Sequence, residues 1–201
     1  MPNAPRDRRS PEATAARRLT ADDWADEALT ALGEGGLAAV AVEPLAIRLG
    51  ATKGSFYWHF PNRIALVEAA LARWEVDHTD GVIALMADEP DPAERLRRLL
   101  RLVVGVSRHD RIEMALLASA DDPVVAPVLA RVTERRIDYV ASLYRELGLS
   151  PAAARRRAVV ALSMYLGHVQ LARAAPDALP SDARAWRRHL DEIVETLLPP
   201  S

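Results

Sequence analysis

The sequence TKGSFYWHFPN, from Thr52 to Asn62, decides how the rest of the chain is interpreted. A short helix over these residues cannot bury its lysine and its consecutive Tyr-Trp-His run at once, so part of that surface must stay exposed. The segment before it has the pattern of a second short apolar helix that ends at Gly50, and glycine tolerates the left-handed backbone of a sharp turn. Two short helices joined in this way are typical of a helix-turn-helix.

Three apolar residues are expected to fill the space between the two helices: Leu45, Leu49 and Phe56. Thr52 is expected to cap the second helix, because its hydroxyl can accept a hydrogen bond from a free backbone N–H of the first turn. One side of the second helix is therefore core, and the opposite side is polar and aromatic.

Counting from the cap, Thr52, Ser55 and His59 share one face, with Lys53 and Trp58 at its borders. Hydroxyl, amine, indole and imidazole groups can bond to phosphates and base edges in a DNA groove. The alternative is an ordinary αα-hairpin with a solvated face. Clustered exposed aromatic side chains favour a binding surface over that alternative.

From Leu19 to about Leu71, roughly a quarter of the chain, the sequence resembles the DNA-binding domain of the TetR family of bacterial transcriptional regulators. The pattern Gly-x-x-Lys-Gly-Ser-Phe-Tyr-Trp-His-Phe-Pro-Asn-Arg, which begins at Gly50, carries most of this resemblance. The family implies an all-α homodimer. In it, an N-terminal three-helix domain binds DNA, and a larger helical domain binds a small molecule and releases the operator.

The resemblance also implies a role for particular side chains. The residues expected to face the operator are Thr52, Lys53, Ser55 and Trp58, and those expected on phosphates are Tyr57, His59 and Arg63. One position departs from the family pattern. Where the family commonly has Thr or Ser capping the first helix of the motif, this chain has Ala41, which cannot supply the hydroxyl that also contacts a phosphate.

We expect three segments: a flexible basic arm over residues 1–18, a helix-turn-helix domain over 19–66, and a ligand-binding and dimerisation domain over 67–201. The arm is rich in proline and arginine, and it could contact DNA or act only as a solubilising tail. Every later segment has a helical pattern, so the predicted fold class is all-α.

Composition limits the remaining possibilities. The 201 residues carry a formal net charge of −2, so affinity for double-stranded DNA has to come from a local surface. The absence of cysteine excludes disulfides and thiolate metal sites. The longest apolar runs are too short to cross a bilayer, and no signal peptide is evident. We therefore expect a cytoplasmic protein that does not associate with membranes.

The helix expected from about residue 152 to 174 is apolar on more than one side, with Val159, Leu162, Leu166 and Val169 in one stripe. Such a helix has more apolar surface than its own chain can cover, so one side is assigned to a second subunit. Together with the last helix, over about 182–198, it would form the interface of a homodimer. The alternative is the central helix of a monomeric bundle.

A small-molecule effector requires a cavity with apolar walls and a few polar groups. Thioether, aromatic and imidazole side chains of the C-terminal part suit such a cavity, although packing is the more common role for each of them. The candidates are Trp74, His78, Met86, Met114, Leu117, Met164, Tyr165 and His168. The grouping of Asp77, His78 and Asp80 is better explained by a solvated helix end than by a metal site, and no cofactor is expected.

The sequence thus predicts a ligand-responsive transcriptional regulator, acting as a repressor, that binds a palindromic operator as a homodimer and is released by a small apolar effector. A helical small-molecule binding protein of the same fold without operator binding is the alternative. An enzyme is disfavoured, because Ser163 and His168 are five residues apart and point to different sides of one helix.

Overall fold

The computed structural model describes residues 18–199, and within them the fold is all-α with no strand, as predicted. The α-helices are α1 (Ala21–Gly35), α2 (Val42–Arg48), α3 (Lys53–Tyr57), α4 (Arg63–Glu75), α5 (Gly81–Ala84), α6 (Pro92–Ser107), α7 (Arg111–Leu117), α8 (Val125–Glu146), α9 (Pro151–Ala174) and α10 (Ala183–Leu197). Except for Arg18, the segment expected to be a basic arm lies outside the described residues.

The helix starts follow the sequence closely. Thr20 and Asp23 cap α1 reciprocally, each side chain bonding to the other residue's backbone N–H. Thr52 accepts a hydrogen bond from the backbone N–H of Ser55 at 3.2 Å and so caps α3, as predicted. Ala41 occupies the cap of α2 without a side-chain hydrogen bond, which is the departure noted in the sequence.

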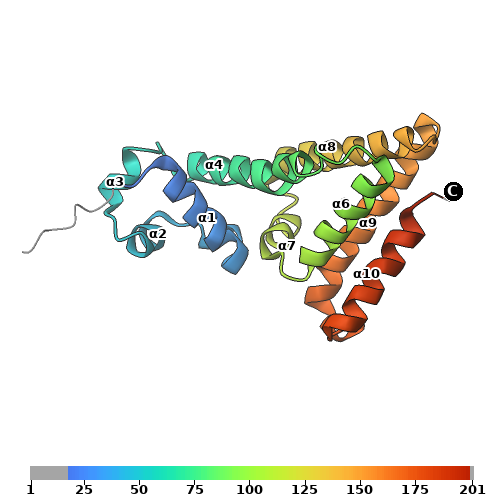
Figure 1. Ribbon diagram of the computed structural model, residues 1–201. Helices are drawn as coiled ribbons and strands as arrows, with labels where there is room; N and C mark the ends of the chain where they lie inside the picture. The colour runs from blue at the N-terminus through green and yellow to red at the C-terminus, as the bar shows by residue number, and fades with distance from the viewer. Residues whose placement is uncertain (1–17, 200–201) are drawn as a thin grey trace, which may run out of the picture.

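Figure 1 shows how α4 leads away from the compact group formed by α1, α2 and α3 toward the larger group of helices that ends with α10. After Glu75 the chain continues through a π-helical turn, Val76–Asp80, and then the short α5. Helix α7 lies between α1 and the larger group and packs against α1. The N-terminal helices are therefore attached to the rest of the chain along two routes, α4 and α7.

Two apolar clusters stabilise this arrangement. The N-terminal cluster is built on Trp24, Phe56 and Trp74, none of which is exposed, and it continues into α7 and α8 through Leu116 and Val125. The C-terminal cluster lies among α6, α8, α9 and α10. No helix of the described part of the chain is both long and apolar enough to span a membrane.

Helix α9 is the longest helix, and its two sides differ. Ala158, Ala161 and Val169 are buried against neighbouring helices, whereas Val159 and Val160 are exposed. The stripe predicted from the sequence is thus divided between a buried and an exposed side. Apolar surface remains uncovered on α9 within the single chain.

The turn between α2 and α3 depends on Gly50, whose φ of +61° lies in the left-handed region. We predict that Gly50→Ala lowers the free energy of unfolding by about 1–2 kcal/mol, because a Cβ disfavours that backbone conformation. Gly105→Ala is the control, since Gly105 lies inside α6 with open space around an added Cβ. It should raise the free energy of unfolding by about 0.5–1 kcal/mol. Urea unfolding followed by circular dichroism measures both, and equal effects of the two substitutions would contradict the prediction.

Candidate nucleic-acid interface and ligand cavity

The five-residue helix α3 presents aromatic side chains to solvent while it is held from beneath. Phe56 is fully buried and packs edge-on against Trp24, with ring centroids 5.4 Å apart. On the opposite side Tyr57 is 55% exposed and Trp58 is 84% exposed. Large aromatic surfaces left in water at this level mark a binding surface in preference to a packing surface.

The other residues predicted to bind DNA lie around this pair. Thr52 and Lys53 are exposed, and Ser55 and His59 are half-buried. The ammonium group of Lys53 donates to the Glu43 carboxylate of α2 at 2.8 Å. This hydrogen bond and the charge of Glu43 raise the pKa of Lys53 above its ordinary value. Because both partners are exposed, the pair contributes little stability, and a phosphate could take the place of Glu43.

Arg63, at the start of α4, has a structural role that the sequence did not reveal. Its guanidinium donates to the backbone carbonyls of Leu37 and Val40, at the 3-10 turn Leu37–Ala39 that follows α1. A guanidinium has five N–H donors, so these bonds leave others available. The phosphate contact of Arg63 stays a prediction, and the side chain also fixes the start of α4 to the turn after α1.

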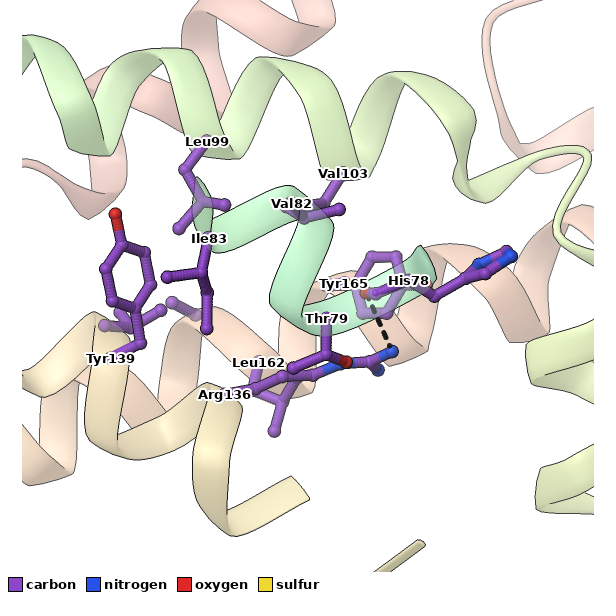
Figure 2. A pocket seen from close by; sticks show the side chains of 12 residues that line it. His78, Thr79, Val82, Ile83, Leu99, Val103, Arg136, Tyr139, Leu162 and Tyr165 are labelled. Atoms are coloured by element: carbon purple, nitrogen blue, oxygen red, sulfur yellow. Dashed lines mark hydrogen bonds between the residues drawn. The ribbon is translucent and has the colours of Figure 1, made fainter. Parts of the chain in front are cut away.

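An apolar cavity of about 70 Å³ lies among the helices of the C-terminal part. Figure 2 shows Tyr139 at one end of it and His78 at the other, with the imidazole pointing away from the apolar side chains. The cavity is lined by His78, Thr79, Val82, Ile83, Leu99, Val103, Arg136, Tyr139, Val140, Ala161, Leu162 and Tyr165. The structure therefore brings together residues from α5, α6, α8, α9 and the π-helical turn.

Of the eight residues proposed from the sequence for this cavity, His78 and Tyr165 line it. The other six lie elsewhere: Trp74 and Met86 are fully buried in the two apolar clusters, Met114 and Met164 are half-buried outside the lining, Leu117 is 37% exposed, and His168 is paired with His189. These six residues were chosen by side-chain type alone. In the structure they lie on helix faces that contact other parts of the protein or solvent.

The lining residues that the sequence analysis missed show a partial signal. Arg136, Tyr139 and Val140 are spaced three and four residues apart on α8, and Leu99 and Val103 are four apart on α6, so each set shares a helix face. That spacing identifies a face. It does not identify which other helix the face meets, and this information comes only from the packing.

A buried polar network closes one end of the cavity. Arg136 donates to both carboxylate oxygens of Glu113 at 2.9–3.1 Å, to the hydroxyl of Thr79 at 3.0 Å and to the backbone carbonyl of His78 at 3.4 Å. The side chain of Glu113 is only 2% exposed. A carboxylate at this depth requires its partner, because an uncompensated buried charge is strongly unfavourable.

Tyr165 extends this network to the start of α7. Its hydroxyl donates to Asp110 at 3.0 Å, and Asp110 in turn accepts the backbone N–H of Glu113 at 2.9 Å. Burial raises the pKa of Tyr165, and the nearby carboxylates of Glu113 and Asp110 raise it further, so the hydroxyl stays a donor. Residues that line the cavity are therefore hydrogen-bonded directly to α7.

The opposite side of α7 contacts α1. Leu116 belongs to the N-terminal cluster, and Ile112 lies so close to Gly33 of α1 that an added Cβ there would be 3.1 Å from its side chain. One short helix thus contacts both the polar network at the cavity and the first helix of the N-terminal group. This is a continuous packed connection between the cavity and the helix-turn-helix.

Asp77, His78 and Asp80, which were considered above as a possible metal site, do not bind a common point in the structure. Asp77 pairs with Arg73 at 2.8 Å, and Asp80 pairs with Arg135 at 2.9 Å. Within residues 18–199 no group of three or more His, Asp or Glu side chains is arranged as metal ligands would be.

Comparison with known proteins defines the class. Residues 25–70 match the family model described as bacterial regulatory proteins, tetR family. A Rhodococcus transcriptional regulator has a similar fold at 20% identity and a TM-score of 0.72, over 89% of this chain and 96% of that one. NemR of E. coli in its reduced form is similar at 15% identity and a TM-score of 0.73, over 91% and 100%. AibR, solved with isovaleryl coenzyme A and operator DNA, is similar at 19% identity and a TM-score of 0.68, over 90% and 99%.

The fold and these matches define the class: a helix-turn-helix domain joined to a larger helical domain, as in solved transcriptional regulators. Residues 25–70 match the DNA-binding domain of the TetR family, and the described chain has the fold of solved TetR-family regulators. Regulators of this family are DNA-binding proteins and not enzymes, in agreement with the expectation from the sequence.

The buried ion pair gives a stability prediction. Glu113→Gln leaves the Arg136 charge uncompensated at the cavity and should lower the free energy of unfolding by about 3–5 kcal/mol. The double variant Glu113→Leu with Arg136→Met removes both charges and should lose far less, because an apolar pair of similar volume can replace a buried ion pair. The single variants Glu113→Leu and Arg136→Met, together with the double variant and the unchanged protein, form a double-mutant cycle that chemical unfolding can measure. Additive losses would show that the two side chains do not depend on each other.

Proposed function

We propose that this protein is a cytoplasmic, ligand-responsive transcriptional repressor that binds a palindromic operator as a homodimer and is released by a small, mostly apolar effector. The observation that carries the proposal is the contrast within α3. Phe56 is fully buried, while its neighbours Tyr57 and Trp58 remain in water. A helix fixed in this manner presents a preformed surface to a DNA groove.

In this proposal the residues of α3 and its flanks divide between two roles. Those that reach base edges are Thr52, Lys53, Ser55 and Trp58, and those that contact phosphates are Tyr57, His59 and Arg63. Phosphate contacts supply affinity and register, whereas base contacts supply sequence preference. The formal net charge of −2 over the whole chain fits a protein whose DNA affinity comes from this one surface.

The proposed effector enters the cavity between α5, α6, α8 and α9. At about 70 Å³ the cavity is smaller than the roughly 300–1,000 Å³ that a drug-sized ligand occupies. Such a ligand can bind only if the surrounding helices move, and a ligand that binds two conformations unequally shifts the equilibrium between them. That AibR has been solved with both an acyl thioester and operator DNA supports a ligand-responsive role.

Two connections could carry this movement to the DNA-binding surface. The π-helical turn that bears His78 and Thr79 is continuous with α4, and α4 starts beside α3. Helix α7 joins the network of Arg136 to α1 through Glu113 and Ile112. The direction of the effect, release of the operator, is part of the proposal.

The second candidate function is a helical small-molecule binding protein of the same fold that does not bind an operator. The alanine cap of α2 favours it, because Ala41 offers no hydroxyl to a phosphate. The exposure of Tyr57 and Trp58 favours the regulator, since a surface released from DNA binding has no reason to keep two adjacent aromatic side chains in water.

The DNA-binding proposal is tested by gel shift with the DNA immediately upstream of the protein's own gene. We expect a saturable complex whose site is a near-palindrome, with half-sites about one helical turn apart or slightly more. Trp58→Ala should lose about 1–3 kcal/mol on this site and little on random DNA, because base contacts carry the preference. Leu85→Ala, at an exposed apolar position outside the helix-turn-helix, is the control and should bind as the unchanged protein does.

Circular dichroism of each variant confirms that the fold is retained. An unchanged ratio of operator to random-DNA affinity in Trp58→Ala would exclude Trp58 from base contact. Absence of any complex on DNA from the whole neighbourhood of the gene would favour the second candidate function.

The dimer proposal rests on the exposed apolar side of α9, where Val160 is 55% exposed and Val159 and Leu171 are also accessible. Val160→Arg should yield a folded monomer, because a charge buried in an apolar interface costs several kcal/mol while the same charge in water costs little. Leu85→Arg, at another position that is 55% exposed, should remain dimeric. Sedimentation velocity distinguishes these outcomes, and a Val160→Arg protein that sediments as a stable dimer would refute the assignment of α9.

A further inference from the structure

A second and wider cavity lies where the N-terminal helices meet the larger group. It has a volume of about 450 Å³ and opens to solvent between α1, the π-helical turn and the end of α6 with the start of α7. Its lining consists of Thr30, Gly33, Glu34, His78, Val106, His109, Asp110, Arg111 and Ile112. We refer to it as the junction groove, because its walls come from both sides of the connection between the helix-turn-helix and the ligand cavity.

The junction groove and the apolar cavity share one residue, His78. In Figure 2 its imidazole lies at the end of the apolar cavity and points away from the apolar lining. His78 is one-third exposed, and its Nδ1 lies 3.9 Å from a carboxylate oxygen of Asp110. His78 therefore lies between an inner space lined mainly by apolar side chains and an outer one lined by polar side chains such as Glu34, His109 and Arg111.

Some polar groups of the junction groove already have hydrogen-bond or ion-pair partners within the protein, and others do not. Glu34 is paired with Arg48 at 2.5 Å, and both oxygens of Asp110 accept hydrogen bonds, from Tyr165 and from the backbone of Glu113. The acceptors of the groove are thus occupied, and the Asp110 side chain is only 6% exposed.

Two donors of the groove, His109 and Arg111, have no such partners among the described residues. Within the described part of the chain, the exposed side chains of His109 and Arg111 form no hydrogen bond and no ion pair. Beside them, Val106 and Ile112 provide apolar contact. A groove whose free polar groups are a guanidinium and an imidazole is suited to an anion, since guanidinium groups bind carboxylate and phosphate oxygens in a bidentate manner.

We propose that the junction groove binds the anionic head group of the effector, a carboxylate or a phosphate, while its apolar chain occupies the inner cavity past His78. Arg111, His109 and His78 contact the head group. This inference rests on the proposed ligand-responsive function and gives the effector a chemical class, an amphipathic anion. It also assigns a binding site outside the apolar cavity.

The position of the head group gives a reason for release. Glu34 belongs to α1, and its carboxylate lines the same groove, so an anion bound there is repelled by it. The same carboxylate holds Arg48 at the end of α2. An anionic head group therefore acts directly on α1 and on its link to α2, whereas an apolar ligand confined to the inner cavity acts only through α4 and α7.

Three probes of equal chain length test the proposal: decanoate, decyl phosphate and decanol, each below its aggregation limit. Calorimetric titration of the full chain, without DNA, should show at least one of the two anions binding tenfold or more tightly than decanol. Arg111→Gln combined with His109→Gln should abolish that preference and leave decanol binding unchanged. Arg98→Gln, an exposed arginine of α6 away from the groove, is the matched control and should keep the preference.

Equal binding of all three probes, or binding of none, would overturn the inference. Because no DNA is present in this titration, the result does not depend on operator binding, and failure of the operator gel shift would be recognised separately. On operator DNA, Glu34→Gln should bind the preferred anion at least as tightly as the unchanged protein but release the operator less. Full release by that variant would overturn the role assigned to Glu34.

Discussion

A helix of five residues cannot hold its own conformation in water, so everything that α3 presents depends on how it is packed. Isolated helices of this length are unstable because the first turn fixes several residues for one hydrogen bond. Here the packing of the buried Phe56 ring against Trp24 and the Thr52 cap provide the stability that a helix of this length does not have alone. Burying a phenylalanine side chain contributes roughly 1.5–3 kcal/mol. The exposed aromatic surface is a consequence of that anchoring.

The same N-terminal cluster also determines how the two ends of the molecule are connected. It includes Leu116 of α7 and Val125 at the start of α8, so it does not stop at the end of the helix-turn-helix. The predicted boundary between residues 66 and 67 therefore falls inside a shared apolar cluster. A rearrangement at the cavity, where Arg136 and Glu113 are paired, acts on a structure that is packed continuously as far as Trp24. Because closely packed interiors have low compressibility, a displacement of side chains at the cavity is passed on to the N-terminal cluster.

Local signals in the sequence predicted the local structure well. The Thr52 cap and the left-handed turn at Gly50 depend on residues only a few positions apart, and the structure has both where the sequence placed them. The lining of the cavity was predicted poorly because it depends on contacts between helices far apart in sequence. Nothing in the sequence around Arg136 and Tyr139 indicates that they line the same cavity as Thr79 and Leu99. Met86 was chosen for its type, and it proved to be a packing residue of the C-terminal cluster.

The pair between Lys53 and Glu43 has a consequence for chemical modification, because Lys53 is the only lysine in the sequence. Acylating reagents attack the deprotonated amine, and the raised pKa of Lys53 keeps that form scarce while Glu43 is in place. Any side-chain amine acylation of this protein is thereby confined to the surface proposed to meet DNA. A single acetyl group there would remove the positive charge and the ion pair together. The arginine-rich remainder of the chain would be unaffected.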